Sequence, residues 1–291
     1  MKTRTLAIGL LAISATVLLS GCSTAGVYIL NSGLKIGADH HANKNIAFGE
    51  EDWQKLDVYQ PANNPEQKKP VLVFFYGGSW DSGRKEMYYF IADAFARRGY
   101  VVVIPDYVKY PKARFPMFIE DGAAAIAWTK NNIADFGGDP ENVFVSGHSA
   151  GAHLGALLLT DESFLQKHQL TPLDINGFVG LAGPYNFTPE SHTLVKIFGP
   201  EENFPKMKTM NFVNGNEPPM LLLHGAKDTT VGVRNQEVLI EKLNEVGNPS
   251  TGRLYPGLSH VGIVASIAPP LRRNTTTLSD MDTFFKAQIT R

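Results

Sequence analysis

NVFVSGHSAGAHLGALLLT, residues 142–160, places a serine in a glycine-rich turn between two apolar runs. The first run predicts a buried strand, and Ala150–Thr160 predicts an apolar helix. A serine hydroxyl becomes an effective nucleophile only when a turn exposes it and a base removes its proton. Gly147 and Gly151 leave the room that a sharp strand-to-helix turn around Ser149 requires. We therefore predict that Ser149 is a catalytic nucleophile.

Strands and helices alternate along the chain from about Ile46. Further apolar runs predict strands at 55–60, 71–76, 100–105, 177–181, 220–224 and 252–255, and longer stretches predict helices at 87–99, 115–136, 234–246 and 277–288. The run 55–60 alternates as an edge strand does. This order predicts the α/β class, with a mostly parallel, doubly wound sheet and helices on both faces. With 291 residues, 43% of them hydrophobic, we expect one catalytic domain over 46–291.

A second motif, Tyr76-Gly-Gly-Ser-Trp80, follows the buried run 71–76. Acyl transfer builds negative charge on a carbonyl oxygen, and fixed N–H donors stabilise that charge. A Gly-Gly turn exposes its amides, and we predict Gly77 as its turn residue. The predicted oxyanion hole consists of the N–H groups of Gly78, Ser79 and Ala150. The alternative is an ordinary turn between a strand and a helix.

Two further candidate residues each follow a predicted strand. Asp228 ends HGAKD after the strand 220–224, and His260 ends GLSH after the strand 252–255. An aspartate orients an imidazole that acts as a base towards serine. The chain order Ser149, Asp228, His260 is the order of α/β-hydrolase triads. We predict this triad. The alternative for Asp228 and His260 is a solvated loop position, and for Ser149 it is a glycine-rich turn that happens to hold serine, as in a phosphate-binding loop.

The other histidines have simpler interpretations. We expect His148 to be the variable residue of the turn, His153 to pack against the core, and His224 to hold the loop of Asp228. No HExxH helix occurs in the sequence. We therefore expect no catalytic metal and no cofactor.

These motifs, with GGDPENV before the serine turn and IPDYVKYP at 104–111, resemble the bacterial carboxylesterase group near hormone-sensitive-lipase-type esterases and arylformamidases. The resemblance covers most of residues 50–290 and implies the α/β-hydrolase fold and a serine carboxylesterase. Two departures stand out. Tyr76 replaces the usual histidine before the glycine pair, and Val108 and Lys109 stand where the family often has arginine and leucine. The resemblance implies that an internal brace near the site is altered.

The long segment 183–218 separates two predicted strands and predicts a lid or binding loop. Its aromatic residues and Trp80 either line an acyl or alcohol pocket or simply pack the segment onto the domain; they are Tyr185, Phe187, Phe198 and Phe204. The segment is too short for a full lipase cap, so we expect small, short-acyl esters as substrates. The alternatives are an arylformamidase-type amidase with the same triad and a catalytically inert, lipid-anchored binding module.

The N-terminus carries a secretory pattern. Lys2 and Arg4 precede an apolar run, and Leu19-Ser-Gly-Cys22 resembles a bacterial lipobox. We predict a signal peptide over 1–21, lipidation of Cys22 with acyl chains such as palmitate, and a tether over 22–45. The alternatives are an ordinary signal peptide and an uncleaved anchor. Ser23, by resemblance to sorting rules, places the protein at the outer membrane facing the periplasm.

The overall charge limits the partners. Lys and Arg number 27 against 28 Asp and Glu, which gives a net charge of -1. Nucleic-acid binding relies on a surplus of basic charge, so we expect no nucleic-acid partner. The expected partners are a small ester substrate and a membrane, reached through the N-terminal lipid. Cys22 is the single cysteine, so the catalytic domain has no disulfide.

Overall fold

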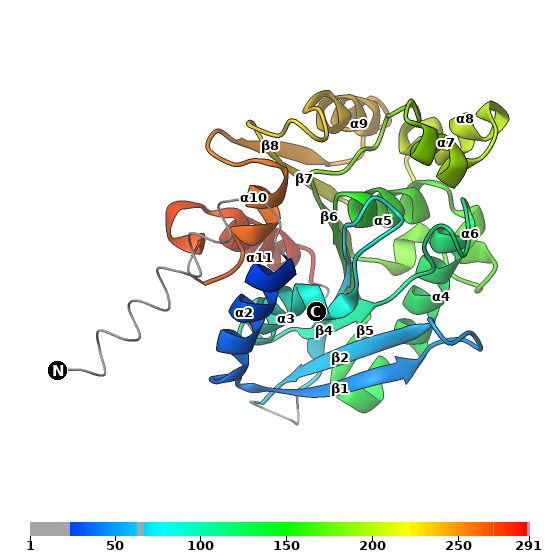
Figure 1. Ribbon diagram of the computed structural model, residues 1–291. Helices are drawn as coiled ribbons and strands as arrows, with labels where there is room; N and C mark the ends of the chain where they lie inside the picture. The colour runs from blue at the N-terminus through cyan, green and yellow to red at the C-terminus, as the bar shows by residue number, and fades with distance from the viewer. Residues whose placement is uncertain (1–23, 63–66, 270, 290–291) are drawn as a thin grey trace.

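The computed structural model describes residues 24–62, 67–269 and 271–289, so the predicted signal peptide and Cys22 lie outside the described residues. An eight-stranded sheet runs through the molecule with helices on both sides (Figure 1). Its strands are β1 (His40–Ala47), β2 (Lys55–Pro61), β3 (Lys69–Phe75), β4 (Val101–Pro105), β5 (Gly138–His148), β6 (Gly177–Leu181), β7 (Met220–Gly225) and β8 (Thr251–Tyr255).

The strand order is β1-β2-β4-β3-β5-β6-β7-β8. β1 and β2 pair antiparallel, as do β2 and β4, whereas every pair from β4 to β8 is parallel. The sheet is therefore mostly parallel, as predicted, and it has the α/β-hydrolase fold. Because β3 to β8 run the same way, the loops that follow them meet at one edge of the sheet.

The N-terminal side of the sheet differs from the prediction. The run 55–60 is not an edge strand, because β1 pairs with its outer side. β1 starts at His40, so the tether prediction over 22–45 is wrong for the residues that pair with β2. The side chains of β1 are mostly exposed and polar, and its position rests on main-chain hydrogen bonds. A hydrophobic pattern could not reveal such a strand.

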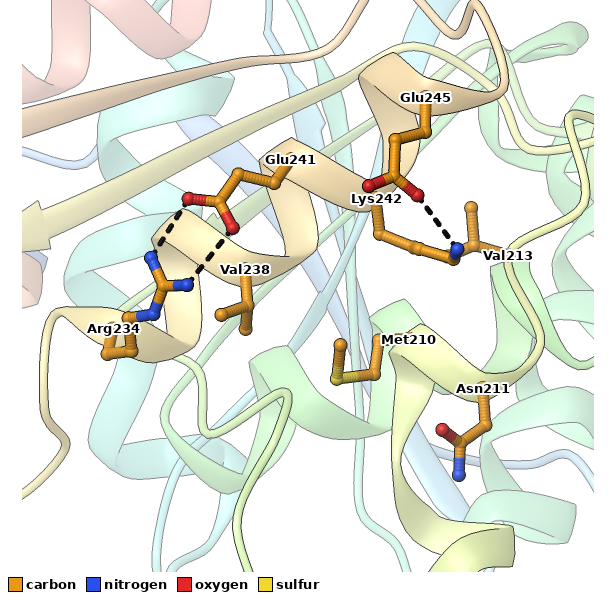
Figure 2. A pocket seen from close by; sticks show the side chains of 8 residues that line it. All are labelled: Met210, Asn211, Val213, Arg234, Val238, Glu241, Lys242 and Glu245. Atoms are coloured by element: carbon orange, nitrogen blue, oxygen red, sulfur yellow. Dashed lines mark hydrogen bonds and ion pairs between the residues drawn. The ribbon is translucent and has the colours of Figure 1, made fainter.

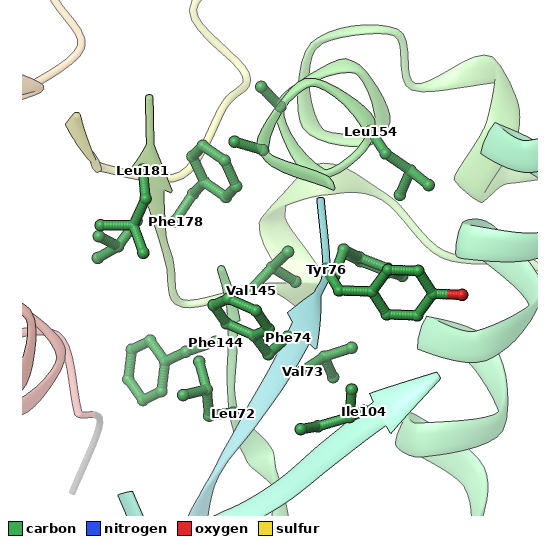
Figure 3. Packing of buried hydrophobic residues seen from close by; sticks show 14 of the residues in the cluster. Leu72, Val73, Phe74, Tyr76, Ile104, Phe144, Val145, Leu154, Phe178 and Leu181 are labelled. Carbon is green, nitrogen blue, oxygen red and sulfur yellow. The ribbon is translucent and has the colours of Figure 1, made fainter. Parts of the chain in front are cut away.

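The central strands form the core of the domain. Every residue from Val71 to Phe75 and from Val143 to Val145 is fully buried. Figure 3 shows side chains on both faces of the central strands: Leu154 lies on the helix that covers one face, whereas Leu72 and Phe144 lie on the opposite face. A parallel sheet covered on both faces requires such continuous apolar strands.

Helices occupy most of the segments between the strands. The α-helices are α2 (Thr24–Lys35), α3 (Tyr89–Ala96), α4 (Met117–Asn132), α5 (Ala150–Thr160), α6 (Ser163–Gln166), α7 (His192–Phe198), α8 (Phe204–Met207), α9 (Arg234–Glu245), α10 (His260–Ala265) and α11 (Thr277–Ala287). The 3-10 helices are η1 (Lys85–Tyr88), η2 (Ile133–Phe136), η3 (Pro172–Asp174), η4 (Glu201–Asn203), η5 (Thr209–Asn211) and η6 (Arg272–Asn274). In the described ranges, no helix combines the length and apolar character needed to cross a bilayer.

The helices cover the two faces of the sheet in separate groups. α3 and α11 share one face, where Phe95 and Phe285 lie with ring centroids 6.0 Å apart. α4 and α5 share the other face, and they approach so closely that a Cβ on Gly122 would lie 2.6 Å from Leu154 Cδ2. α5 is thus held between the sheet and α4, which fixes the helix that begins after Ser149.

Two further segments pack onto this framework. α2 is docked on the domain, because the buried Asn31 side chain donates to the carbonyls of Glu86 and Met87. The predicted lid 183–218 consists of short helices, α7, η4, α8 and η5, between β6 and β7. Figure 1 shows α7 and α8 beside α5 and α9, at the end of the sheet where the parallel strands terminate.

Candidate active site

Ser149 occupies a strained turn between β5 and α5. Its backbone has φ 54° and ψ -120°, and its N–H donates to the carbonyl of Leu181 at 2.9 Å. A Cβ on Gly147 would lie 2.4 Å from the Gly151 carbonyl oxygen, and one on Gly151 would lie 2.1 Å from the Phe75 carbonyl oxygen. Only glycine fits at both positions. A positive φ at a non-glycine residue costs about 1–3 kcal/mol, which the surrounding structure must offset.

The structure brings the three predicted triad residues together. His260 Nε2 lies 2.9 Å from Ser149 Oγ, and His260 Nδ1 lies 2.7 Å from Asp228 Oδ2. Since the carboxylate is an acceptor, Nδ1 carries the proton, and Nε2 is free to accept the serine proton. His260 is the first residue of α10, whose first turn is capped by Ser259 Oγ, accepting from the Gly262 N–H at 3.2 Å. Side chains from three segments that are far apart in the chain thus form one hydrogen-bonded line.

The carboxylate of Asp228 is fully enclosed and fully hydrogen-bonded. Oδ1 accepts from the N–H groups of Thr230 and Val231 at 2.8 and 2.9 Å. His224 Nε2 lies 3.1 Å from Oδ2 and 2.9 Å from the Val231 carbonyl oxygen. Burial alone would raise the pKa of Asp228, but hydrogen bonds from Val231 and His260 hold it below its usual value. His224 holds this loop in place, as expected from the sequence.

The predicted oxyanion turn has an unusual backbone. Gly78, Ser79 and Trp80 have φ values of 142°, 50° and 60°. A Cβ on Gly78 would lie 2.3 Å from the Ser82 carbonyl oxygen. The N–H groups of Gly78, Ser79 and Ala150 donate to no other residue within the described ranges. These amides are available to an oxyanion, as the oxyanion-hole prediction requires.

Gly77 links the oxyanion turn to a residue that the sequence did not predict. Its N–H donates to Tyr88 Oη at 3.1 Å, and Tyr88 Oη lies 3.2 Å from His148 Nδ1. A Cβ on Gly77 would lie 2.9 Å from His148 Nδ1. No local pattern marks Tyr88, because its partners are remote in sequence. The predicted turn role of Gly77 agrees with this close packing.

The two departures from the family pattern meet behind the oxyanion turn. Tyr76 Oη donates to Asp106 Oδ1 at 2.7 Å, and Lys109 Nζ donates to Tyr76 Oη at 2.8 Å. Lys109 Nζ also lies 3.1 Å from the Tyr107 carbonyl oxygen. Burial raises the pKa of Tyr76, which keeps its hydroxyl protonated, and burial lowers the pKa of Lys109. Tyr76 and Lys109 therefore form a brace of their own, which we call the Tyr76–Lys109 brace.

The aromatic residues of the lid form a packed wall with Trp80. The Trp80 ring stacks on Phe187 with centroids 5.3 Å apart and meets the edge of Phe198 at 4.8 Å. His153, one turn after Ser149, packs edge-on to Trp80, and its Nε2 donates to the Met207 carbonyl at 2.7 Å. Tyr185, Phe198 and Phe204 are buried, so they pack the lid onto the domain, while Phe187 is half-buried.

Two surface hollows lie away from the triad. The larger, of about 480 Å³, lies between η5 and α9, and Figure 2 shows the ion pairs Arg234–Glu241 and Lys242–Glu245 at its rim. The other, of about 410 Å³, lies on the lid. The charged groups of the larger hollow pair with each other at the surface, where such pairs contribute little. Among the described residues, no group of three or more His, Cys, Asp or Glu side chains could hold a metal ion.

Comparison with known proteins places this chain in a family. The BD-FAE family model matches residues 56–243. Isoprenylcysteine alpha-carbonyl methylesterase ICME of Arabidopsis thaliana is 29% identical over 259 residues, which cover 81% of this chain and 60% of that protein. Esterase LipC of Mycobacterium tuberculosis is 31% identical over 237 residues, 75% of this chain and 59% of that protein. The chain thus spans about three fifths of the length of these relatives.

Solved structures share the fold. A truncated carbohydrate esterase from gut microbiota has a TM-score of 0.74 at 21% identity, covering 85% of this chain and 96% of its own. The apo form of Thermogutta terrifontis esterase 2 has a TM-score of 0.71 at 22% identity, covering 88% of this chain and 97% of its own. At this identity the likeness concerns the fold alone.

Proposed function

Because the chain belongs to the BD-FAE family of α/β-hydrolase esterases, we propose that it hydrolyses small carboxylic esters through an acyl-enzyme on Ser149. The observation that carries the proposal is the hydrogen-bonded line from Ser149 Oγ through His260 to Asp228, with distances of 2.9 and 2.7 Å. This geometry pairs a strained, positioned serine with a base of fixed tautomer.

The first half of the reaction is acylation. Ser149 Oγ attacks the ester carbonyl carbon, and its proton passes to His260 Nε2. The carbonyl electron pair moves onto oxygen, which accepts hydrogen bonds from the amides of Gly78, Ser79 and Ala150. Asp228 stabilises the imidazolium without taking its proton. The intermediate then collapses, the bond to the alcohol oxygen breaks, and His260 donates its proton to that oxygen.

The second half releases the acid. A water molecule attacks the acyl carbon while His260 Nε2 takes one of its protons. Collapse of the second intermediate breaks the bond to Ser149 Oγ, which regains a proton from His260. Substrate, water and the three side chains supply every proton and electron pair of this cycle.

The aromatic wall supports a short-acyl preference. Trp80 directly follows the oxyanion residue Ser79, and it is only 4% exposed against Phe187 and Phe198. A long acyl chain on this side would have to displace packed rings. The names of the relatives, a methylesterase and an esterase, favour an ester bond over an amide bond.

Hydrolysis of model substrates tests the proposal. The full chain and its Ser149→Ala variant are assayed with p-nitrophenyl acetate, butyrate and octanoate, and with N-formylkynurenine. We expect turnover to be highest on the two short esters and to fall roughly 10⁶-fold in the variant. Fast deformylation with feeble ester cleavage would reassign the protein to the amidases. Folded protein that cleaves none of these compounds, and that a fluorophosphonate leaves unlabelled, would favour the inert binding module.

We further propose that Cys22 carries lipid and anchors the enzyme in the bacterial cell envelope, at the outer membrane facing the periplasm. The lipobox-like Leu19-Ser-Gly-Cys22 and the basic, then apolar, leader support this proposal. Metabolic labelling with an alkyne analogue of palmitate should mark the wild type and leave the Cys22→Ala variant unmarked. Equal labelling of both proteins would refute the anchor.

A further inference from the structure

A continuous line of hydrogen bonds runs behind the triad. The Gly77 N–H donates to Tyr88 Oη at 3.1 Å, Tyr88 Oη lies 3.2 Å from His148 Nδ1, and His148 Nε2 lies 3.0 Å from the His260 carbonyl oxygen. The line starts in the oxyanion turn and ends on the main chain of the catalytic base. It connects residues after β3, in η1, at the end of β5 and at the start of α10.

The two ends of this line fix the direction of every bond. The Gly77 N–H can only donate, and the His260 carbonyl can only accept. His148 must therefore carry its proton on Nε2, so Nδ1 has a lone pair that accepts from the Tyr88 hydroxyl. Tyr88 Oη in turn accepts from Gly77. All three bonds are satisfied by one tautomer of His148 and one rotor of Tyr88.

The surroundings keep His148 in this neutral state. Its side chain lies in the interior, at 4% exposure for the residue. Burial, followed by the charge on His260, lowers the pKa of His148 to about 3. The rings of His148 and His260 lie 5.0 Å apart, and the hydrogen bond between the two residues runs to the main chain of His260. His148 therefore acts on the base through the backbone.

We propose that Tyr88 and His148 are positioning residues that hold the oxyanion turn and the catalytic base in register with each other. The inference rests on the proposed function, and it goes beyond the triad and the oxyanion hole. Catalysis requires His260 Nε2 and the amides next to Gly77 to stay aligned on the same tetrahedral carbon. A displacement of about 1 Å in such a site can cost 10²-fold in rate.

The hydroxyl makes Tyr88 more than a packing residue. Without its hydroxyl, Nδ1 of His148 has no donor and the Gly77 N–H has no acceptor. The oxyanion turn and the His148 ring then lose the hydrogen bonds that join them. The ring of Tyr88 packs on Phe74, Tyr76 and Phe90 at centroid distances of 5.6 to 5.9 Å, so phenylalanine at this position keeps the packing.

The first experiment removes one hydroxyl from the full chain. We expect Tyr88→Phe to lower kcat on p-nitrophenyl butyrate by about tenfold to a hundredfold and to change KM by less than about threefold. Tyr100→Phe is the matched control, because it removes a buried hydroxyl that is hydrogen-bonded to Asp282 at 3.0 Å. Tyr100 immediately precedes β4, whereas the active-site segments follow the parallel strands. We expect the control to retain wild-type kcat. A kcat for Tyr88→Phe within twofold of the control overturns the proposal.

The second experiment varies His148. His148→Gln retains a terminal N–H donor for the His260 carbonyl, whereas His148→Leu retains none. We expect the glutamine variant to keep several times the kcat of the leucine variant. We also expect Tyr88→Phe to add no further loss in the leucine variant, because residues in one network are not additive. Equal kcat in both His148 variants, or full additivity, contradicts the proposal.

The third measurement reads the tautomer without turnover. Nitrogen-15 spectra of histidine-labelled protein should show His148 with its proton on Nε2, and Tyr88→Phe should shift both the His148 and the His260 ring signals. The His148→Gln variant assigns the His148 signals. A proton on Nδ1 in the wild type, or unchanged His260 signals, overturns the inference. An inactive wild type with these signals as expected would instead refute the proposed function alone.

Discussion

Replacing Lys109 by methionine tests whether the Tyr76–Lys109 brace depends on its charge. Lys109 Nζ donates to Tyr76 Oη at 2.8 Å and to the Tyr107 carbonyl at 3.1 Å. The ammonium also lies 5.2 and 5.3 Å from the ring centroids of the same two tyrosines. Methionine keeps the apolar stem of the side chain and removes these interactions. Tyr76 Oη keeps its own bond to Asp106 in the variant.

The size of the effect follows from opposing contributions. A hydrogen bond to a charged group contributes about 1.5–3 kcal/mol, and a partly buried cation over an aromatic ring about 0.5–2 kcal/mol. Burying the ammonium works against these gains, and the lowered pKa of Lys109 reflects that desolvation. We therefore expect Lys109→Met to lower the free energy of unfolding by about 2 kcal/mol. We expect kcat to fall about tenfold, because Tyr76 immediately precedes the oxyanion turn.

Urea unfolding measures the change, as a lower midpoint at an unchanged m-value. Lys112→Met is the matched control, since Lys112 is exposed and lies 3.7 Å from the centroid of the Trp53 ring. An exposed pair of this kind contributes about 0.5–1 kcal/mol. If Lys109→Met is no more destabilising than Lys112→Met and keeps full activity, the brace does not act through its charge and the reasoning is wrong.

Three other perturbations test the rest of the site. Gly151→Ala places a Cβ 2.1 Å from the Phe75 carbonyl oxygen, so we expect either no folded protein or no labelling of Ser149 by a fluorophosphonate, read on a gel. The control Gly232→Ala, which has open space around it, should be labelled like the wild type. His153→Leu leaves the Met207 carbonyl without its donor at 2.7 Å, so we expect the free energy of unfolding to fall by about 1–3 kcal/mol and proteolysis within 183–218 to become faster. Unchanged cleavage would show that this hydrogen bond does not hold the segment on the domain. Hydrogen bonds hold the pKa of Asp228 below its usual value, and burial lowers that of His148 to about 3, so neither group titrates near neutral pH. The contribution of Asp228 to stability is complete above its unfolded pKa and is lost as pH falls through its lower folded pKa. Neither Asp228 nor His148 should therefore contribute to the pH dependence of kcat/KM near neutral pH, and a second slope there would contradict this.

The sequence predicts an element or a site residue well where a local pattern, such as an apolar run or a motif after a strand, accompanies it. The strand 177–181 and the helix 150–160 match β6 and α5, because apolar runs bounded by glycine or polar residues leave few alternatives. Ser149 directly follows β5, and Asp228 and His260 lie a few residues after the ends of β7 and β8. The parallel sheet brings such positions to one edge. The joint prediction of the three residues follows from this geometry, although they are far apart in the chain.

Features that depend on partners distant in sequence could not be predicted in the same way. β1 carries polar, exposed side chains, and its pairing with β2 leaves no periodic pattern. Tyr88 lies in a short 3-10 helix with no motif around it, and only the fold brings its hydroxyl to Gly77 and His148. The sequence predicts His148 only as the variable residue of the turn, because the residue before the serine has no fixed chemistry in the turn pattern.

The Tyr76–Lys109 brace shows why departures from a family pattern must be judged together. Taken alone, a tyrosine in place of histidine at position 76 buries a hydroxyl that needs partners, and a lysine at 109 buries a charge that costs energy. The fold places Lys109 Nζ 2.8 Å from Tyr76 Oη, and Asp106 accepts from that hydroxyl. Each residue thereby satisfies the requirement that the other creates. The oxyanion turn keeps a rigid support with different side chains, so the missing histidine is no argument against catalysis in this chain.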